Sequence, residues 1–286
     1  MFAFGLGAAL LASALFNVGI ALQGLEARAA PTRLGLRLGL LARLLRRPRW
    51  ILGLILGLVG IGPQVVALAE APFVVVQPAL AVGLLLLLLL GAKLFHERVG
   101  AGEVIGVVAI IGGLALVAWG APPHSEIHRG GTAVIAVVAA LAVLAVAPFR
   151  LRGTRFDFAM GTIVASGCGF GASNIATKLL SDDVSAGHWA NAGLWAVVGL
   201  ATGVAATLTG MTAFQRRAAT TVVPVSTSVQ TFLPIVLEPL FLREHWSSAN
   251  LDGATIVAGL IVALVGTTLV SRARAVSDLI AGATGG

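Results

Sequence analysis

The sequence predicts an all-α polytopic membrane protein with about nine transmembrane helices. Of its 286 residues, 58% are hydrophobic and 11% are charged, whereas soluble domains carry about 25% charged residues. The mean hydropathy is +0.98. Long apolar runs such as residues 84–90 differ from the alternating pattern of an outer-membrane barrel. The composition therefore excludes a soluble enzyme and a disordered chain.

Nine apolar stretches approach the length needed to cross a hydrocarbon layer of about 30 Å. The expected spans are residues 2–23, 51–69, 73–95, 104–120, 132–148, 158–180, 189–210, 219–242 and 250–271. Sixteen of the 19 Lys and Arg residues fall in the loops on one side of these spans. Because basic loops stay in the cytoplasm, we expect the N-terminus outside and the C-terminus in the cytoplasm. The chain is then a multi-pass protein of the plasma membrane.

The net charge of +7 would suggest a nucleic-acid partner in a soluble protein. In a membrane protein, cytoplasmic arginines instead bind anionic lipids, so we expect such lipids and no nucleic acid. The single cysteine, Cys168, offers neither a disulfide nor a metal pattern. His124 and His128 fall in an outside loop with Pro122 and Pro123, which is weak evidence for a metal site. We expect no metal and no cofactor.

The chain repeats itself weakly at a constant offset. Glu97, Gly106 and Gly112 recur as Glu244, Gly253 and Gly259, and Pro78 and Pro224 match after a one-residue gap. The match relates spans 1–4 to spans 6–9. Five is an odd number, and successive spans cross the membrane in opposite directions. The two halves are therefore expected to be inverted. The predicted organisation is a first repeat at 1–120, a connector helix with its loops at 121–157, a second repeat at 158–272 and a cytoplasmic tail at 273–286.

Residues 33–47 are expected to form an amphipathic helix on the cytoplasmic membrane surface. Four leucines fall on one helical face and four arginines on the other: Leu34, Leu38, Leu41 and Leu45, and Arg33, Arg37, Arg43 and Arg47. Five arginines between residues 33 and 47 make a transmembrane position expensive, and the two faces suit the membrane interface. The segment is either a topology anchor or an element that binds anionic lipid.

The repeated pattern resembles the EamA-type half of the drug/metabolite transporter superfamily. The residues that carry it are Pro78, Lys93-Leu94-Phe95-His96-Glu97, Gly106 and Gly112, with Pro224, Leu242-Arg243-Glu244, Gly253 and Gly259 in the second half. The opening residues 17–23 and the nine spans are more similar to the NIPA-like branch, which is associated with magnesium transport. Two features depart from the family: four spans in each half instead of five, and His96 and Arg243 where the pattern has glycine before the glutamate.

Polar side chains inside the spans are the candidate site residues, because polar groups are costly in lipid. Glu238 is the acidic residue well inside a span, and Thr227 and Thr231 share its helical face, with Gln230 beside them. The other candidates for substrate binding or coupling are Lys178, Asn174, Gln77, Gln64 and Asn17. Each can instead bond to a neighbouring helix, and Lys178 can extend to the outer surface. No catalytic residue is expected.

These patterns favour a secondary transporter that moves a small organic metabolite or amphiphilic solute by alternating access. Glu238 and Lys178 fall at similar depths, so we expect an ion pair whose separation lets Glu238 take a proton. The alternatives are a magnesium transporter, a flippase for lipid-linked substrates and a non-transporting scaffold subunit. An enzyme is not expected, because all five histidines fall in expected loops. A homodimer remains open.

Overall fold

The computed structural model describes residues 2–70, 76, 79–95, 97, 99–120, 132–151, 158–242 and 254–283. Every regular element among these residues is a helix. The helices are α1 (Phe2–Arg28), the 3-10 helix η1 (Thr32–Leu34), α2 (Leu38–Leu44), α3 (Pro48–Glu70), α5 (Gly83–Leu94), α6 (Ala101–Gly120), α7 (Thr132–Arg150), α8 (Phe158–Ser185), α9 (Trp189–Phe214), α10 (Ala219–Leu242) and α11 (Ala254–Ala283). The predicted all-α class is confirmed for the described chain.

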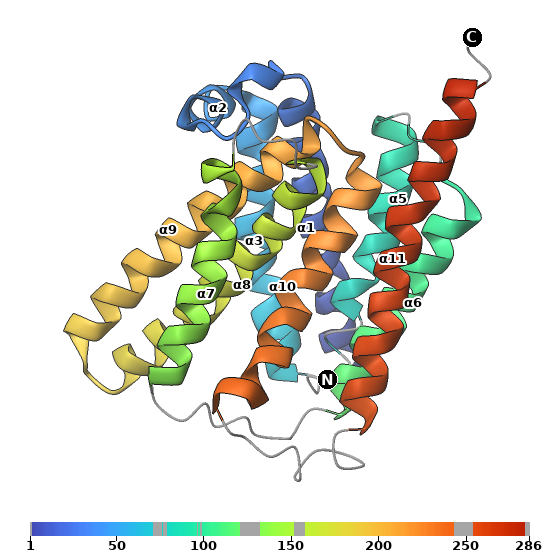
Figure 1. The fold of residues 1–286 in the computed structure, drawn as a ribbon. Coiled ribbons are helices and arrows are strands. Elements are labelled where there is room, and N and C mark those ends of the chain that lie inside the picture. The colour runs from blue at the N-terminus through green and yellow to red at the C-terminus, as the bar shows by residue number, and fades with distance from the viewer. Residues whose placement is uncertain are drawn as a thin grey trace.

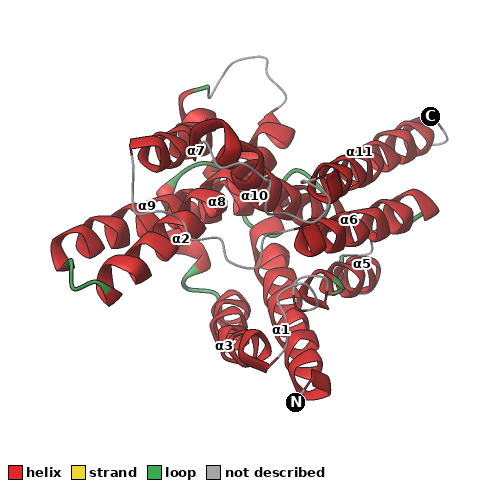
Figure 2. Cartoon of the chain, turned by 90° about the horizontal axis from the view of Figure 1, so that it is seen from below, coloured by secondary structure: helices red, strands yellow, loops and turns green. Residues whose placement is uncertain are grey.

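The long helices lie side by side and run alternately up and down, with the short helix α2 across one end (Figure 1). We call this end of the bundle the α2 end. Figure 2 shows the same helices from the opposite end, with α6 and α11 together and α1 beside α3. Three described helices, α1, α6 and α9, are long and apolar enough to cross a membrane by length and composition. This is the character of a membrane protein.

Outward faces of the bundle carry large apolar side chains. The exposed fraction is 60% for Leu58 on α3, 71% for Leu200 on α9 and 67% for Leu264 on α11. Soluble proteins rarely expose apolar patches of this extent. The same side chains are favourable against lipid, which agrees with the membrane character of the long helices.

The expected helix at 33–47 is wrong in its extent. The described chain forms η1, then bends at Gly35 and Leu36, and resumes as α2 at Leu38. Leu36 has a φ of 56°, and its backbone N–H donates to Thr212 Oγ1 at 3.0 Å. This contact with α9 fixes a left-handed residue that a continuous helix does not permit.

α2 packs against the bundle through two leucines. Leu40 and Leu44 are fully buried, whereas Leu38 and Leu45 of the expected apolar face are 71% and 54% exposed, which leaves them free to face lipid. Leu40 and Leu44 join the core cluster that contains Trp50 and Phe214.

Glycines allow α6 and α11 to pack with their backbones almost in contact. A Cβ added at Gly113 would lie 2.6 Å from the carbonyl oxygen of Gly259, and one at Gly266 would lie 2.5 Å from that of Gly106. α1 and α3 meet in the same way, at Gly19 and Gly53. Helices in lipid lack a hydrophobic drive to associate, so close packing of small residues supplies the attraction.

Two adjacent glycines of α6 give a matched test of this packing. A Gly113→Ala substitution should lower the free energy of unfolding by about 1–3 kcal/mol, because its Cβ would clash with Gly259 and Ala263. Gly112→Ala should cause no loss, since no atom lies within 4 Å of its added Cβ. Thermal unfolding in detergent micelles measures both. Equal losses in the two variants would contradict the backbone contact.

Candidate functional site

A buried carboxylate, Glu97, joins four helix ends at the α2 end of the bundle. Glu97 follows α5, where its own N–H donates to the Gly91 carbonyl at 3.0 Å, and its side chain is only 3% exposed. Its Oε1 accepts hydrogen bonds from Arg28 Nη2 at 2.7 Å and from the Ala219 N–H at 2.9 Å. Its Oε2 accepts from the Thr220 N–H at 3.2 Å and from Thr220 Oγ1 at 2.8 Å. We call Arg28, Glu97, Ala219 and Thr220 the Glu97 junction.

Arg28 links the Glu97 junction to the end of α9. Its Nη2 also donates to the Arg217 carbonyl at 3.1 Å, and its Nε donates to the Phe214 carbonyl at 3.4 Å. The guanidinium carbon lies 4.7 Å from the centroid of the Phe95 ring, within the range of a cation–π contact. Arg28 therefore contacts residues from the ends of α5 and α9 while it closes α1.

The two charges of the junction match the dipoles of the helices that they contact. The first N–H groups of a helix and its last C=O groups lack partners within the helix. The anion Glu97 accepts from the first N–H groups of α10, and the cation Arg28 donates to carbonyls at the end of α9. Each charge is thus placed at the helix end where the dipole favours it.

Glu97 is held in its ionised form by these contacts. Burial by itself would raise the pKa of the Glu97 carboxyl, but the hydrogen bonds from Arg28, Ala219 and Thr220 together hold the pKa below its ordinary value. The carboxylate therefore stays charged near neutral pH despite its burial, and the junction stays closed.

In the first half, Asn17 lies at the contact between α1 and α5. It is 6% exposed, and its Nδ2 donates to the Ser13 carbonyl at 2.8 Å. The Ser13 hydroxyl donates to the Leu80 carbonyl. A Cβ added at Gly83 would lie 2.1 Å from Asn17 Nδ2 and 2.2 Å from Ser13 Oγ. Glycine is therefore required at position 83 for this polar contact between the helices.

In the second half, Thr227, Gln230 and Thr231 lie half-buried on α10. Beside them Ser228 is buried, donates to the Pro224 carbonyl at 2.9 Å and accepts from Thr267 Oγ1 of α11 at 2.9 Å. α10 and α11 are thus joined by a hydrogen bond between the hydroxyl groups of Ser228 and Thr267.

The structure describes the side chains of two of the remaining candidates, Gln64 and Asn174. Gln64 lies half-buried on α3, and Asn174 is exposed on α8. Glu238 and Lys178 belong to α10 and α8, but their side chains lie outside the described residues, as does Gln77. Among the described residues, no group of three His, Cys, Asp or Glu side chains is arranged to hold a metal ion.

The residues that contact Glu97 could not be predicted from the sequence. Glu97 is marked by the repeat, but Arg28 counts there only as one of many cytoplasmic arginines. A weak signal was present, because Arg28 ends the first span and Glu97 follows the third, so both fall on the same side of the membrane. Nothing in the sequence pairs either of them with Ala219 or Thr220.

No protein-family model matches the chain, and no curated protein or solved structure shows significant similarity to it. The resemblance to the drug/metabolite transporter superfamily therefore rests on the motifs quoted above.

Removal of the Glu97 charge tests the junction. Glu97→Gln should lower the free energy of unfolding by about 2 kcal/mol, because it leaves Arg28 without its counter-ion and weakens the cap of α10. Glu26→Gln is the matched control: Glu26 lies 4.0 Å from an Arg47 side chain that is 51% exposed. That change should cost less than about 0.5 kcal/mol. Thermal unfolding in detergent compares them, and similar losses would refute the junction's role.

The junction also predicts a dependence on pH. Because the folded pKa of Glu97 is lowered, its stabilising contribution is complete above the pKa of the unfolded carboxyl. It is lost as the pH falls through the lower, folded value. The difference in unfolding temperature between wild type and Glu97→Gln should therefore shrink between about pH 5 and pH 3. A difference that stays constant over this range would show that Glu97 is not ionised in the folded protein.

Proposed function

We propose that the chain is a secondary transporter of the plasma membrane that moves a small organic metabolite or amphiphilic solute by alternating access. The proposal includes nine spans, arranged as two inverted four-helix repeats with α7 as connector. The observation that carries it is a packing pattern that occurs twice. α1 packs along α3 and against α5, and α8 packs along α9 and against α10. Contacts of α5 with α6 match those of α10 with α11.

The directions of these helices support inversion of the two halves. α1 runs toward the α2 end and α8 runs away from it, and α3 and α9, α5 and α10, and α6 and α11 are likewise opposed (Figure 1). The antiparallel pair α6 and α11 meets at Gly113 and Gly259, and the sequence repeat matches Gly259 with Gly112, the residue next to Gly113. An axis through this contact would exchange the two halves, as in transporters with inverted repeats.

Charge supports an orientation with the α2 end in the cytoplasm. The helix ends and turns at this end carry most of the described basic residues: Arg28, Arg33, Arg37, Arg43, Arg46, Arg47, Arg49, Lys93, Arg150, Arg216 and Arg217. Segments rich in Lys and Arg stay on the cytoplasmic side during insertion. The Glu97 junction then belongs to the cytoplasmic side of the transporter.

In this scheme the Glu97 junction is the cytoplasmic gate. Arg28 and Glu97 belong to the first repeat, and Ala219 and Thr220 belong to the second. Opening the cytoplasmic side would separate the repeats and break the hydrogen bonds of Glu97 to α10. Glu238 and Lys178 remain the proposed coupling pair on the opposite side, on the sequence argument given above.

Cysteine labelling tests the orientation in a Cys168→Ser background. Gly39→Cys should react with an impermeant reagent only after the membrane is permeabilised, and Ala186→Cys should react in intact cells. Both positions are exposed, and a Cβ at position 39 has 3.9 Å to its nearest neighbour. Leu40 is unsuitable because it is fully buried. The opposite pattern of labelling would reverse the proposed topology.

Proteoliposomes that contain a pH-sensitive dye test transport and its coupling. Organic cations, amino acids, sugars and nucleosides are added in turn. With the wild-type protein, at least one of these solutes should move together with protons and change the signal of the dye. Glu238→Gln should reduce that proton flux at least about tenfold, a size ordinary for loss of a proton-transfer group. Glu70→Gln, at the end of α3, is the control and should retain the flux.

The outcomes separate the two parts of the proposal. Solute uptake without a change in proton flux in Glu238→Gln would remove Glu238 from the mechanism. If no added solute moves in wild type, in comparison with empty liposomes, the transport proposal fails and a scaffold subunit is favoured. A magnesium-sensitive dye in parallel liposomes tests the cation alternative.

A further inference from the structure

A basic hollow lies at the elbow where α2 turns into α3. Its volume is about 630 Å³, and its lining includes Gly39, Ala42, Arg43, Arg46 and Arg47. The glycine and the alanine leave room on the α2 side. At about 30 Å³ for each water, the hollow has space for roughly twenty water molecules. It is therefore large enough for a phosphate group together with the groups attached to it.

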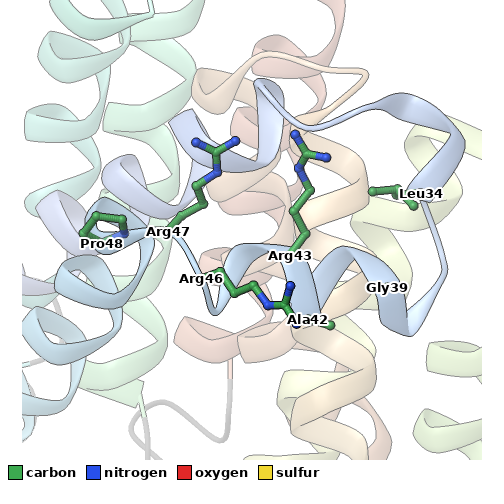
Figure 3. Close-up of a pocket in the computed structure, with 7 residues that line it drawn as sticks. All are labelled: Leu34, Gly39, Ala42, Arg43, Arg46, Arg47 and Pro48. Atoms are coloured by element: carbon green, nitrogen blue, oxygen red, sulfur yellow. The ribbon is translucent and has the colours of Figure 1, made fainter.

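Three arginines contribute to the lining of this space. In Figure 3 the guanidinium groups of Arg43 and Arg47 extend in the same direction from the elbow, and Arg46 lies below them, toward Ala42. The tight turn after α2 fixes this arrangement, since the N–H groups of Arg46 and Arg47 donate to the carbonyls of Arg43 and Leu44. Guanidinium groups bind phosphate oxygens through paired, charge-assisted hydrogen bonds.

The charge of the hollow favours an anion over a zwitterion. Within the part of the chain that the structure describes, Glu26 is the acidic side chain that pairs with these arginines, 4.0 Å from Arg47, so three guanidinium charges face one carboxylate there. A group with a net negative charge reduces this excess. A zwitterionic phospholipid carries a cationic group with its phosphate and leaves the excess unchanged.

An apolar surface continues from the hollow along α3. Leu52, Ile55 and Leu58 are 49%, 48% and 60% exposed and fall on one side of the helix at a spacing of three residues. From Pro48 to Leu58 the helix rises about 15 Å, at 1.5 Å for each residue. This is half of the roughly 30 Å hydrocarbon layer, so it is the depth of the acyl chains in one leaflet.

We propose that the elbow between α2 and α3 is a binding site for an anionic phospholipid. The phosphate of the headgroup binds Arg43, Arg46 and Arg47, and the acyl chains lie against the exposed face of α3. The combination of basic hollow and apolar face selects a lipid over a free phosphate, which would use only the first. The site requires a membrane and does not depend on transport.

The test uses the full chain in phosphatidylcholine nanodiscs, with Trp50 as reporter. Trp50 is buried at the start of α3 and donates to Met211 Sδ at 3.5 Å; the other four tryptophans are replaced by Phe. Bromine on lipid acyl chains quenches nearby tryptophan. Brominated phosphatidylglycerol should quench Trp50 with an apparent affinity about tenfold above that of brominated phosphatidylcholine.

Two variants with equal loss of charge separate the site from general attraction. Arg43→Gln, Arg46→Gln and Arg47→Gln together should abolish the preference for phosphatidylglycerol. Arg33→Gln, Arg37→Gln and Arg216→Gln should keep it within about twofold, because they change only the surface potential. All six arginines are exposed, so these substitutions leave the packing of the helices intact.

Either of two results would overturn the proposal. An equal loss of preference in both variants would mean that the anionic surface, not the hollow, attracts the lipid. Displacement of brominated phosphatidylglycerol by inorganic phosphate, but not by sodium chloride of the same ionic strength, would mean that the hollow binds free phosphate instead. Retention of wild-type quenching in the presence of phosphate, together with the difference between the variants, supports the lipid site.

Discussion

The ion pair between Arg28 and Glu97 is the interaction on which the α2 end of the bundle depends. Helix ends inside a bundle leave backbone groups that need partners, and water reaches them poorly near a membrane. Here one anion satisfies the start of α10 and one cation satisfies the end of α9. Each charge is costly to bury alone. Their pairing offsets the cost of burying each charge at its helix end, and it holds the first and second halves of the chain together.

Elsewhere the helices are held together mainly by close packing at glycines. Gly106 and Gly113 of α6 meet Gly266 and Gly259 of α11, and Gly19 meets Gly53. Large apolar residues such as Leu200 also face outward, to an extent that is rare in soluble proteins. Small residues at the closest helix contacts, with large apolar residues on the outer faces, are expected where the surroundings are as apolar as the core. The Glu97 junction thus satisfies helix ends at one end of the bundle, whereas the glycine contacts let the helices pack closely along their length.

The helices could be predicted from the sequence because long apolar runs leave few alternatives. The structure extends several of them, with α1 reaching Arg28 and α8 reaching Ser185. The break in the helix expected at 33–47 could not be predicted, because the contact of Leu36 with Thr212 of α9 imposes it. The Glu97 junction was missed for a similar reason, since its hydrogen bonds cross 69 and 122 positions of sequence. The polarity of Asn17 marks it in the sequence, but its position against Gly83 depends on how α1 packs on α5. Such long-range pairings have no local pattern.

The distance in sequence between Glu97 and α10 has a consequence for biosynthesis. Arg28 and Glu97 leave the ribosome well before their other partners, because Ala219 follows Glu97 by 122 residues. At about 5–20 residues per second, that interval lasts about 6–24 s. During it, the newly inserted first half holds a charged pair whose remaining hydrogen-bond capacity is unfilled. The arrival of α9 and α10 fills it, so completion of the second half locks the first half into its final arrangement.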